Sequence, residues 1–341
     1  MRRAARAGCS IAATLAAFVA GGCDFPYDRC DDAAPGDERV CPMPGYLDRA
    51  FSLAVPAAWD GASPLPIVFE LHGGGGNRTG ADRLTCPGGD AGDPACLRAK
   101  ALAAGYAVVQ PDGVGTRPLR NLRTWNAGGG AGDWQCTSGA ACASGSDDVG
   151  YFDDLHAELA RILPIDAARV YATGISNGAA MVYRLACERP ERLAAIAPVG
   201  GGNQFAAAGG ACAGGVAVLH IHGTADPCWA YGGGTAACAQ KDGKRKVGVD
   251  DTLAGARARN GCSDTFSEEP LPDTADDGMT SVRVRWQGCA VAVELVRVDG
   301  GGHTWPGGWQ YVSADRVGPV TRDFDADDLI VEFFDAHPKA R

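Results

Sequence analysis

Six short apolar runs recur along this chain of 341 residues, and several of the gaps between them have helical spacing. Apolar runs of this length are typical of strands that are buried on both faces of a sheet. Such strands in alternation with helices predict the α/β class, with a mostly parallel central sheet and helices on both of its faces. The runs begin at Ile67, Tyr106, Ala168, Leu193, Val216 and Val291.

Three segments carry the start and stop signals of helices. Asp147 and Asp148 can cap a helix over residues 147–163, and Asn177 can start another that ends before Pro190. A third helix is predicted within residues 321–338. The stretches between the elements are rich in Gly and Asp and are expected to be surface loops. They cover residues 126–146, 205–215 and 263–278, and the last is interpreted as a solvated acidic insertion.

The start of the chain has the features of a bacterial export signal, in which arginines precede an apolar stretch over residues 10–20 and small residues follow it. We expect residues 1–22 to be a signal peptide, 23–45 a prologue and 46–341 a single folded domain. Cys23 resembles the acylated cysteine of a lipoprotein, which would place the protein on the cell envelope. Ordinary cleavage and free secretion are the alternative.

Cysteine usage indicates an oxidising compartment. Of 14 cysteines, Cys9 and Cys23 belong to the export segment, which leaves an even number in the exported chain. The chain has no C-x-x-C pair, which disfavours a zinc site. Sequence does not fix the connectivity, but the spacing suggests six sequential pairs: Cys30 with Cys41, Cys86 with Cys96, Cys136 with Cys142, Cys187 with Cys212, Cys228 with Cys238, and Cys262 with Cys289.

The formal net charge of -10 disfavours nucleic acid as a partner, because phosphate backbones attract basic surfaces. The basic cluster at residues 241–246 is short and interrupted by glycine, so we interpret it as a solvated loop. We expect the protein to act as a monomer without a cofactor.

The sequence GISNG, residues 174–178, joins the apolar run that begins at Ala168 to the predicted helix that begins at Asn177. In a chain with 49 glycines this motif carries little weight alone, but a strand-to-helix turn is the setting of a nucleophile elbow. The amino terminus of the helix supplies N–H groups that favour a developing oxyanion. Ser176 is therefore the candidate nucleophile, and a small residue in a glycine-rich turn is the alternative.

A serine nucleophile needs a base, and the base needs a carboxylate that orients it. His303 is the histidine that follows a predicted strand beyond both Ser176 and a candidate acid. That acid is Asp226 in HGTADP, and the order Ser, Asp, His is that of the α/β hydrolases. A capping aspartate before Pro227 and a structural loop histidine are the alternatives.

Acyl transfer also needs N–H donors that point at the carbonyl oxygen. Asn177 follows the nucleophile and supplies one donor, and the HGGGG turn at residues 72–76 supplies the other from Gly74. A phosphate-binding loop is the alternative for this turn, but the Gly-Lys-Ser or Gly-Lys-Thr of a P-loop is missing.

Metal-assisted hydrolysis is the competing chemistry, because His220 and His222 share one face of a predicted strand near Asp226. A histidine pair within an apolar strand is more often structural, and no further clustered ligands complete a site. We therefore expect no bound metal.

Six motifs together resemble the extracellular polyhydroxybutyrate depolymerase and feruloyl esterase group of bacterial α/β hydrolases, which is similar to carbohydrate esterase family 1. They are LHGGGGN, TWNAGGGAG, SDDVGYFDDL, GISNGAAMVYRLAC, HGTADP and GGGHTWPGG. The resemblance begins near Tyr46 and extends to the C-terminus. It implies the same triad and oxyanion donors, and it places Trp305 beside the acyl pocket. The chain departs from the group at Gly128 to Gly130, where relatives often have cysteines, and in its long acidic insertion.

The function expected from these residues is that of an exported serine carboxylesterase, which acts on hydroxyalkanoate or on feruloylated polysaccharide through an acyl-enzyme. An acetylxylan esterase or another cell-wall carbohydrate esterase is one alternative, and a non-catalytic binding protein on a hydrolase scaffold is another. Five tryptophans are candidates for a surface on which a polymer stacks: Trp125, Trp134, Trp229, Trp305 and Trp309.

Overall fold

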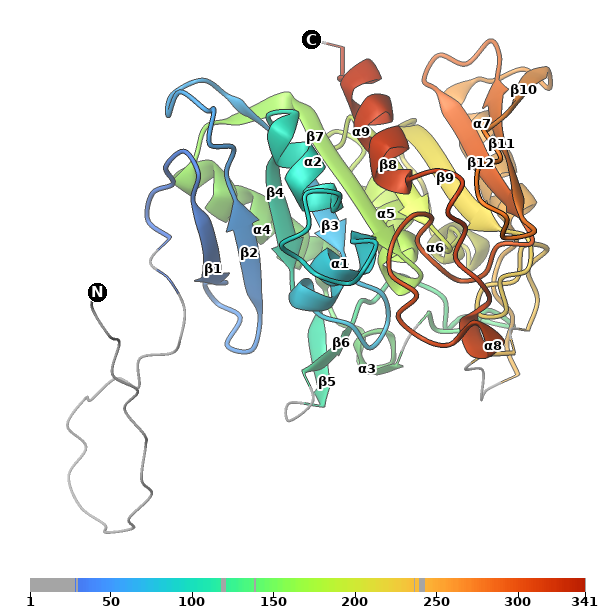
Figure 1. Cartoon of the computed structure of the whole chain (residues 1–341). Helices are drawn as coiled ribbons and strands as arrows, with labels where there is room; N and C mark the ends of the chain where they lie inside the picture. The colour runs from blue at the N-terminus through green and yellow to red at the C-terminus, as the bar shows by residue number, and fades with distance from the viewer. Residues whose placement is uncertain are drawn as a thin grey trace.

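A ten-stranded mixed sheet forms the centre of the molecule (Figure 1). The structure is a computed structural model that describes residues 28, 30–117, 121–137, 139–235, 237–238 and 243–340. The strand order in the sheet is β1-β2-β4-β3-β7-β8-β9-β12-β11-β10. A separate two-stranded sheet pairs β5 (Val114–Arg117) with β6 (Leu122–Thr124).

The six interior strands run parallel to one another and are the six strands that the sequence predicts. Every residue of β3, β4, β8 and β9 is buried, which explains why these strands are continuous apolar runs in the sequence. Their bounds are β4 (Ala107–Pro111), β3 (Leu65–Leu71), β7 (Ile165–Ile175), β8 (Ala195–Val199), β9 (Ala217–Gly223) and β12 (Val293–Asp299).

Antiparallel strands extend the sheet at both edges, and the sequence analysis missed them. At one edge lie β1 (Glu38–Pro42) and β2 (Ala50–Ala54), and at the other β11 (Thr280–Trp286) and β10 (Phe266–Pro270). The predicted boundary at residue 46 therefore falls inside the sheet, since β1 lies in the supposed prologue. Strand β10 corrects the prediction of a loop over residues 263–278, although all five of its residues are exposed.

Helices cover the sheet on both faces, as predicted, and pack into two separate hydrophobic clusters. One face holds α4 (Asp148–Ile162), α5 (Asn177–Glu188) and α7 (Val249–Asn260), and the other holds α1 (Arg78–Thr85), α2 (Leu97–Ala103) and α9 (Ala326–Ala336). Three of these, α4, α5 and α9, match the predicted helices. Short helices α3 (Gly139–Ala143) and α6 (Gln204–Ala207) lie in segments that were expected to be loops, and α8 (Ala314–Val317) follows β12.

All six predicted disulfide pairs are present, and each joins cysteines that are consecutive in the described chain. A disulfide content of this kind is typical of proteins that fold outside the reducing cytosol. The predicted signal peptide, Cys9 and Cys23 lie outside the described residues. Within the described ranges, no helix combines the length and the apolar character needed to cross a bilayer.

Strand β3 carries one buried carboxyl group among its apolar residues. Glu70 is 1% exposed, and its Oε2 accepts a hydrogen bond of 2.7 Å from Gln110 Nε2. Burial, followed by the negative charge of Asp82, raises the pKa of Glu70 to about 8, although the Gln110 bond opposes the shift. Glu70 is therefore protonated in the folded protein at neutral pH.

This raised pKa predicts that the contribution of Glu70 to stability falls as the pH rises. The folded state holds the proton more tightly than the unfolded state, so stability is lost between the ordinary glutamate pKa near 4.5 and about 8. The loss between pH 5 and pH 9 amounts to ~4 kcal/mol. We expect Glu70→Gln to gain about this much stability relative to the wild type between pH 5 and pH 9, measured by chemical denaturation. An equal difference at both pH values would contradict the prediction.

Candidate active site

The turn between β7 and α5 holds Ser176 in an unusual backbone conformation. Its φ of 59° lies in the left-handed region that L-residues rarely adopt. The neighbouring residues of the turn are buried, whereas Ser176 is partly exposed. This geometry lifts the side chain out of a buried segment at the end of a central strand, as a nucleophile elbow does.

Close contact with the end of β3 explains why glycine flanks this serine. A Cβ atom on Gly174 would lie 2.5 Å from the Leu71 carbonyl oxygen, and one on Gly178 would lie 2.4 Å from it. A Cβ on Gly201, after β8, would lie 2.4 Å from the Ser176 carbonyl oxygen. The three glycines therefore allow three chain segments to meet at Ser176.

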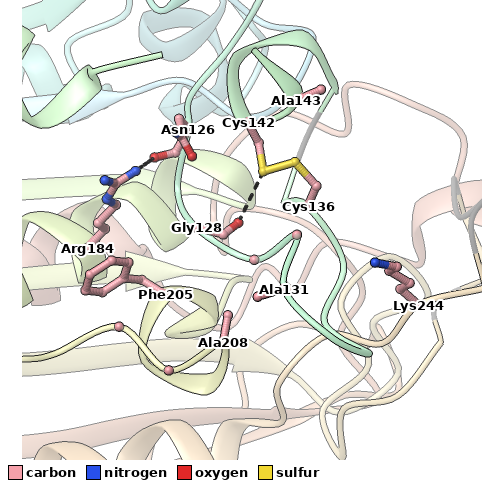
Figure 2. Close-up of a pocket in the computed structure, with 14 residues that line it drawn as sticks. Asn126, Gly128, Ala131, Cys136, Cys142, Ala143, Arg184, Phe205, Ala208 and Lys244 are labelled. Carbon is pink, nitrogen blue, oxygen red and sulfur yellow. Dashed lines mark hydrogen bonds between the residues drawn. A yellow bond between two sulfur atoms is a disulfide. The ribbon is translucent and has the colours of Figure 1, made fainter. Parts of the chain in front are cut away.

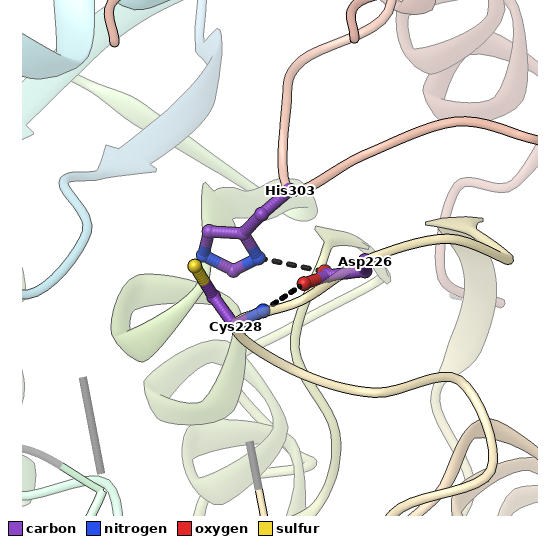
Figure 3. Close-up of side chains that lie close together, drawn as sticks. All are labelled: Asp226, Cys228 and His303. Carbon is purple, nitrogen blue, oxygen red and sulfur yellow. Dashed lines mark hydrogen bonds and ion pairs between the residues drawn. The ribbon is translucent and has the colours of Figure 1, made fainter. Parts of the chain in front are cut away.

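Asp226 and His303 follow two neighbouring parallel strands, β9 and β12, whose ends pair at Gly223 and Val298. His303 Nδ1 lies 2.7 Å from Asp226 Oδ2 (Figure 3). The other carboxylate oxygen, Oδ1, accepts hydrogen bonds of 2.7 Å from the backbone N–H groups of Cys228 and Trp229. The carboxylate is therefore fixed in one orientation, with one oxygen toward the histidine.

Asp226 is ionised although it is only 4% exposed. Burial on its own would raise its pKa, but the charge of His303 and the hydrogen bonds from His222 and His303 outweigh burial and hold the pKa well below its usual range. A permanently negative carboxylate at this position favours the imidazolium form of His303 whenever that ring takes up a proton.

Ser176 and His303 line the same cavity, which has a volume of about 620 Å³. A Cβ on Gly200 would lie 3.4 Å from His303 Nδ1 and 3.7 Å from Asp226 Oδ2, so the loop after β8 runs between the histidine and the serine turn. The structure thus brings together the three side chains that the sequence singles out, from the ends of β7, β9 and β12.

The HGGGG turn forms another wall of this cavity and is fixed by the His72 ring. His72 Nε2 accepts a hydrogen bond from the Gly113 N–H at 3.0 Å, so the proton of the neutral ring lies on Nδ1, which donates to the Gly73 carbonyl at 2.8 Å. Burial lowers the pKa of His72 to about 4, so the ring is neutral at neutral pH. Because the Gly73–Gly74 peptide is trans, its N–H points away from this anchored carbonyl.

The backbone N–H groups of Gly74 and Asn177 both belong to residues that line the cavity. Across the part of the chain that the structure describes, neither N–H donates to another protein group. The Asn177 side chain is occupied elsewhere, since its Oδ1 accepts from the Trp125 N–H at 2.7 Å and its Nδ2 donates to the Trp125 carbonyl at 3.0 Å. Both backbone donors are thus available to an oxygen in the cavity.

The predicted role of Trp305 does not fit the structure. This side chain is 1% exposed, packs in the cluster beneath α9 and donates from Nε1 to Asp327 Oδ1 at 2.7 Å. Trp309 and Tyr311, a few residues further on, line the cavity instead. Trp125 and Trp229 are also buried, so of the five proposed stacking tryptophans only Trp309 borders this cavity.

A second cavity of about 670 Å³ lies beside the loop over residues 126–143 (Figure 2). Arg184 lines it, but this side chain is paired with Glu188 at 2.6 Å and donates to the Asn126 carbonyl at 2.6 Å. The residues that line this cavity include the Cys136–Cys142 disulfide and no pair of nucleophile and base. The smaller cavity at Ser176 is therefore the candidate active site.

The candidate cluster of metal ligands among the described residues is Asp226, Cys228 and His303, shown in Figure 3. The Cys228 sulfur is bonded to Cys238, so it is not available as a thiolate, and the other two side chains are hydrogen-bonded to each other. The ring nitrogens of His220 and His222 lie within hydrogen-bond distance of each other, of the Tyr183 hydroxyl and of the Trp229 carbonyl. The donor set therefore suits a hydrogen-bonded triad better than a cation.

Comparison with known proteins finds esterases among the relatives of this chain. No family model matches the chain. It is 30% identical to feruloyl esterase C of Emericella nidulans over 254 residues, which cover 74% of this chain and 76% of that protein. It is 31% identical to feruloyl esterase D of Neurospora crassa over 156 residues, 46% of this chain and 47% of that protein. The solved structure of sOPH has the same fold, with a TM-score of 0.50 at 15% identity, over 91% of this chain and 89% of that chain.

The fold and the site thus define an α/β hydrolase, and its relatives make it a carboxylic ester hydrolase. Within that class the chain belongs to the feruloyl esterase family.

The contact between the serine turn and β3 predicts the effect of adding one methyl group. We expect Gly178→Ala to lower the free energy of unfolding by about 1–3 kcal/mol, because backbone carbonyls must move to admit a Cβ. Displacement of Ser176 should also lower kcat/KM for p-nitrophenyl butyrate by about 100-fold. The matched control is Gly232→Ala, where a Cβ meets nothing within 4 Å. Equal activity in the two variants would refute this account.

Proposed function

We propose that the protein is a serine carboxylesterase in which Ser176 is the nucleophile, His303 the base and Asp226 the acid. The observation that carries the proposal is that a serine on a strained turn shares one cavity with a histidine that is hydrogen-bonded to a buried carboxylate. The order of the three residues along the chain, and their places after β7, β9 and β12, support it.

Acylation begins when Ser176 Oγ attacks the ester carbonyl carbon and His303 takes the hydroxyl proton at Nε2, the nitrogen that does not face Asp226. The carbonyl oxygen becomes negative and is stabilised by the N–H groups of Gly74 and Asn177. The bond to the alcohol oxygen then breaks, and His303 returns its proton to that oxygen. The acid part of the substrate remains bound to Ser176 as an ester.

Deacylation repeats these steps with water as the nucleophile. His303 takes a proton from water, whose oxygen attacks the acyl carbon, and the same two N–H groups stabilise the second oxyanion. The bond to Ser176 breaks, and His303 returns the proton to the serine oxygen. The carboxylic acid leaves, and the three side chains are restored to their starting state.

Removal of the nucleophile tests the proposal. We expect Ser176→Ala to lower kcat for p-nitrophenyl butyrate by at least about 1,000-fold, because no acyl-enzyme can form. Ser267→Ala, on the exposed strand β10, is the matched control and should retain full activity. Activity of Ser176→Ala at the wild-type rate would refute the serine mechanism. Absence of hydrolysis by the wild-type protein on any ester would favour the binding-protein alternative.

We also propose that the substrate is a feruloyl or related ester with a bulky acyl group. Leu84, Ile175, Trp309, Tyr311 and Val317 give the cavity an apolar side. The Trp309 ring rests on Gly89, where a Cβ would lie 2.6 Å from it, and Arg83 lies over the ring at 4.8 Å. A flat ring that is fixed in this way suits contact with an aromatic acid.

We expect Trp309→Ala to lower kcat/KM for methyl ferulate roughly tenfold while kcat/KM for p-nitrophenyl acetate changes less than about twofold, because only the larger acyl group reaches that wall. Trp134→Ala, which changes a partly buried tryptophan that does not line the cavity, should leave both rates unchanged. Equal losses on both esters would refute the role of Trp309. Parallel rates on acetylated xylan and hydroxybutyrate oligomers test the two alternative substrate classes.

We further propose that the enzyme acts outside the cytosol as a monomer on feruloylated or acetylated polysaccharide. Residues 1–22 would be its signal peptide, and Cys23 would carry a lipid anchor. The six disulfides support export. The anchor rests on the sequence around Cys23 alone.

A further inference from the structure

A line of hydrogen-bonded side chains runs from the centre of α5 to the acid of the proposed triad. The Tyr183 hydroxyl lies 2.7 Å from His220 Nδ1, and His220 Nε2 lies 3.1 Å from His222 Nδ1. His222 Nε2 lies 2.7 Å from the Trp229 carbonyl oxygen and 3.3 Å from Asp226 Oδ2. Tyr183, His220 and His222 are each at most 1% exposed, so no solvent competes for these bonds.

The Trp229 carbonyl fixes the position of one proton in this line. A carbonyl oxygen can only accept, so His222 Nε2 carries a proton and donates it to the Trp229 carbonyl at 2.7 Å, and Asp226 Oδ2 lies 3.3 Å from the same nitrogen. Burial, followed by the charge of His222, lowers the pKa of His220 well below its usual value, so the His220 ring is neutral. One nitrogen of a neutral imidazole donates and the other accepts, so His220 links His222 Nδ1 to the Tyr183 hydroxyl.

Asp226 Oδ2 consequently has a ring nitrogen on each of two sides. His303 Nδ1 lies 2.7 Å away, and the protonated Nε2 of His222, on β9, lies 3.3 Å away. The N–H dipole of His222 stabilises the negative charge of this oxygen, so it weakens the stabilisation that the oxygen gives to a protonated His303. The Oδ1 atom is held separately by two backbone N–H groups, so the carboxylate keeps its orientation without His222.

We propose that His222 is a positioning residue that sets the proton affinity of the catalytic base through Asp226, with the Trp229 carbonyl fixing its tautomer and His220 and Tyr183 supporting its ring. This inference rests on the proposed serine mechanism. It gives the H-x-H pattern of β9 a role other than metal binding or passive packing. His222 touches no substrate and acts only through the oxygen that it shares with His303.

His220, Asp226 and Tyr231 lie beside His222, and Arg297 is its register partner on β12. The Tyr231 ring lies 5.9 Å away with a pKa that burial raises to about 12. Asp226 and Tyr311 contact His303, while His72 and Lys246 line the same cavity. Of these, Asp226 is the acceptor that both histidines share.

The test is the pH profile of kcat/KM for p-nitrophenyl butyrate in His222→Leu, in which the donor to Oδ2 is lost. We expect the acidic limb of the profile to move up by about one pH unit. Activity at pH 6 should then fall about tenfold, and activity at pH 9 should stay within about twofold of the wild type. His222→Gln retains an N–H donor near the Nε2 position and should return the limb to its wild-type position.

Tyr183→Phe is the matched control, because it removes the hydrogen bond between Tyr183 and His220 and keeps the His222 N–H next to Asp226 Oδ2. The Trp229 carbonyl and Asp226 still require a proton on His222 Nε2, so this variant should lose stability and leave the limb in place. A His222→Leu limb at the wild-type position would overturn the inference. The Ser176→Ala variant separates the two proposals. Full activity of Ser176→Ala would refute the serine mechanism. If Ser176→Ala is inactive and the acidic limb of His222→Leu stays at the wild-type pH, only the role of His222 is refuted.

A measurement on the wild-type protein covers the case in which His222→Leu does not fold. Nitrogen NMR of ¹⁵N-histidine-labelled protein should show a proton on Nε2 of His222, the nitrogen that faces the Trp229 carbonyl and Asp226. An unprotonated Nε2 on His222 would overturn the inference.

Discussion

The contact between the β7–α5 turn and the carbonyl end of β3 is the constraint on which the site depends. Side chains at positions 174 and 178 would collide with the Leu71 carbonyl, so only glycine lets the two segments meet. The same contact brings the HGGGG turn against the serine, where a Cβ on Gly73 would lie 3.5 Å from the Ser176 Cβ. The proposed nucleophile and the proposed oxyanion donor are thus positioned by one backbone interface, and neither depends on a flexible side chain.

The second half of the site is assembled by the sheet. Asp226 and His303 are 77 residues apart in the chain, and the parallel pairing of β9 with β12 places them 2.7 Å apart. The carboxyl ends of parallel strands meet at one edge, so chemistry from distant segments gathers there. The His220 and His222 side chains come from the interior of β9, which connects the core of the molecule to this edge.

The interior of the fold was predictable from sequence, and its edges were not. Strands that are buried on both faces are mostly apolar, so the six interior strands are recognisable as apolar runs despite a few buried polar residues such as Glu70 and His220. Strand β10 has the sequence FSEEP with every residue exposed, and its pairing with β11 depends on backbone hydrogen bonds that leave no trace in hydropathy. Strand β1 has only one buried residue, Cys41, so it gives no apolar run either, which is why a boundary at residue 46 was predicted.

The proposed site residues could be predicted from sequence where they directly follow a strand. They could not be predicted where the packing of a loop determines which side chain faces the cavity. Ser176, Asp226 and His303 each follow an apolar run at a short distance, and the structure brings all three together. Trp305 and Trp309 lie four residues apart in one loop. Trp305 is buried in the core and Trp309 lines the cavity, and this difference arises from tertiary packing. The hydrogen bond from Trp305 to Asp327 of α9 is a contact that no pattern in either segment reveals.

The sequential pairing of the cysteines has a consequence for how the chain matures. The bridged cysteines are separated by only 6 to 27 residues, and no bridge spans another. A chain threaded through a membrane from its amino terminus would present each cysteine to its partner before the next pair emerges. Oxidation in order of emergence therefore yields the native bonds, and such a protein needs little help from an enzyme that reshuffles wrong ones.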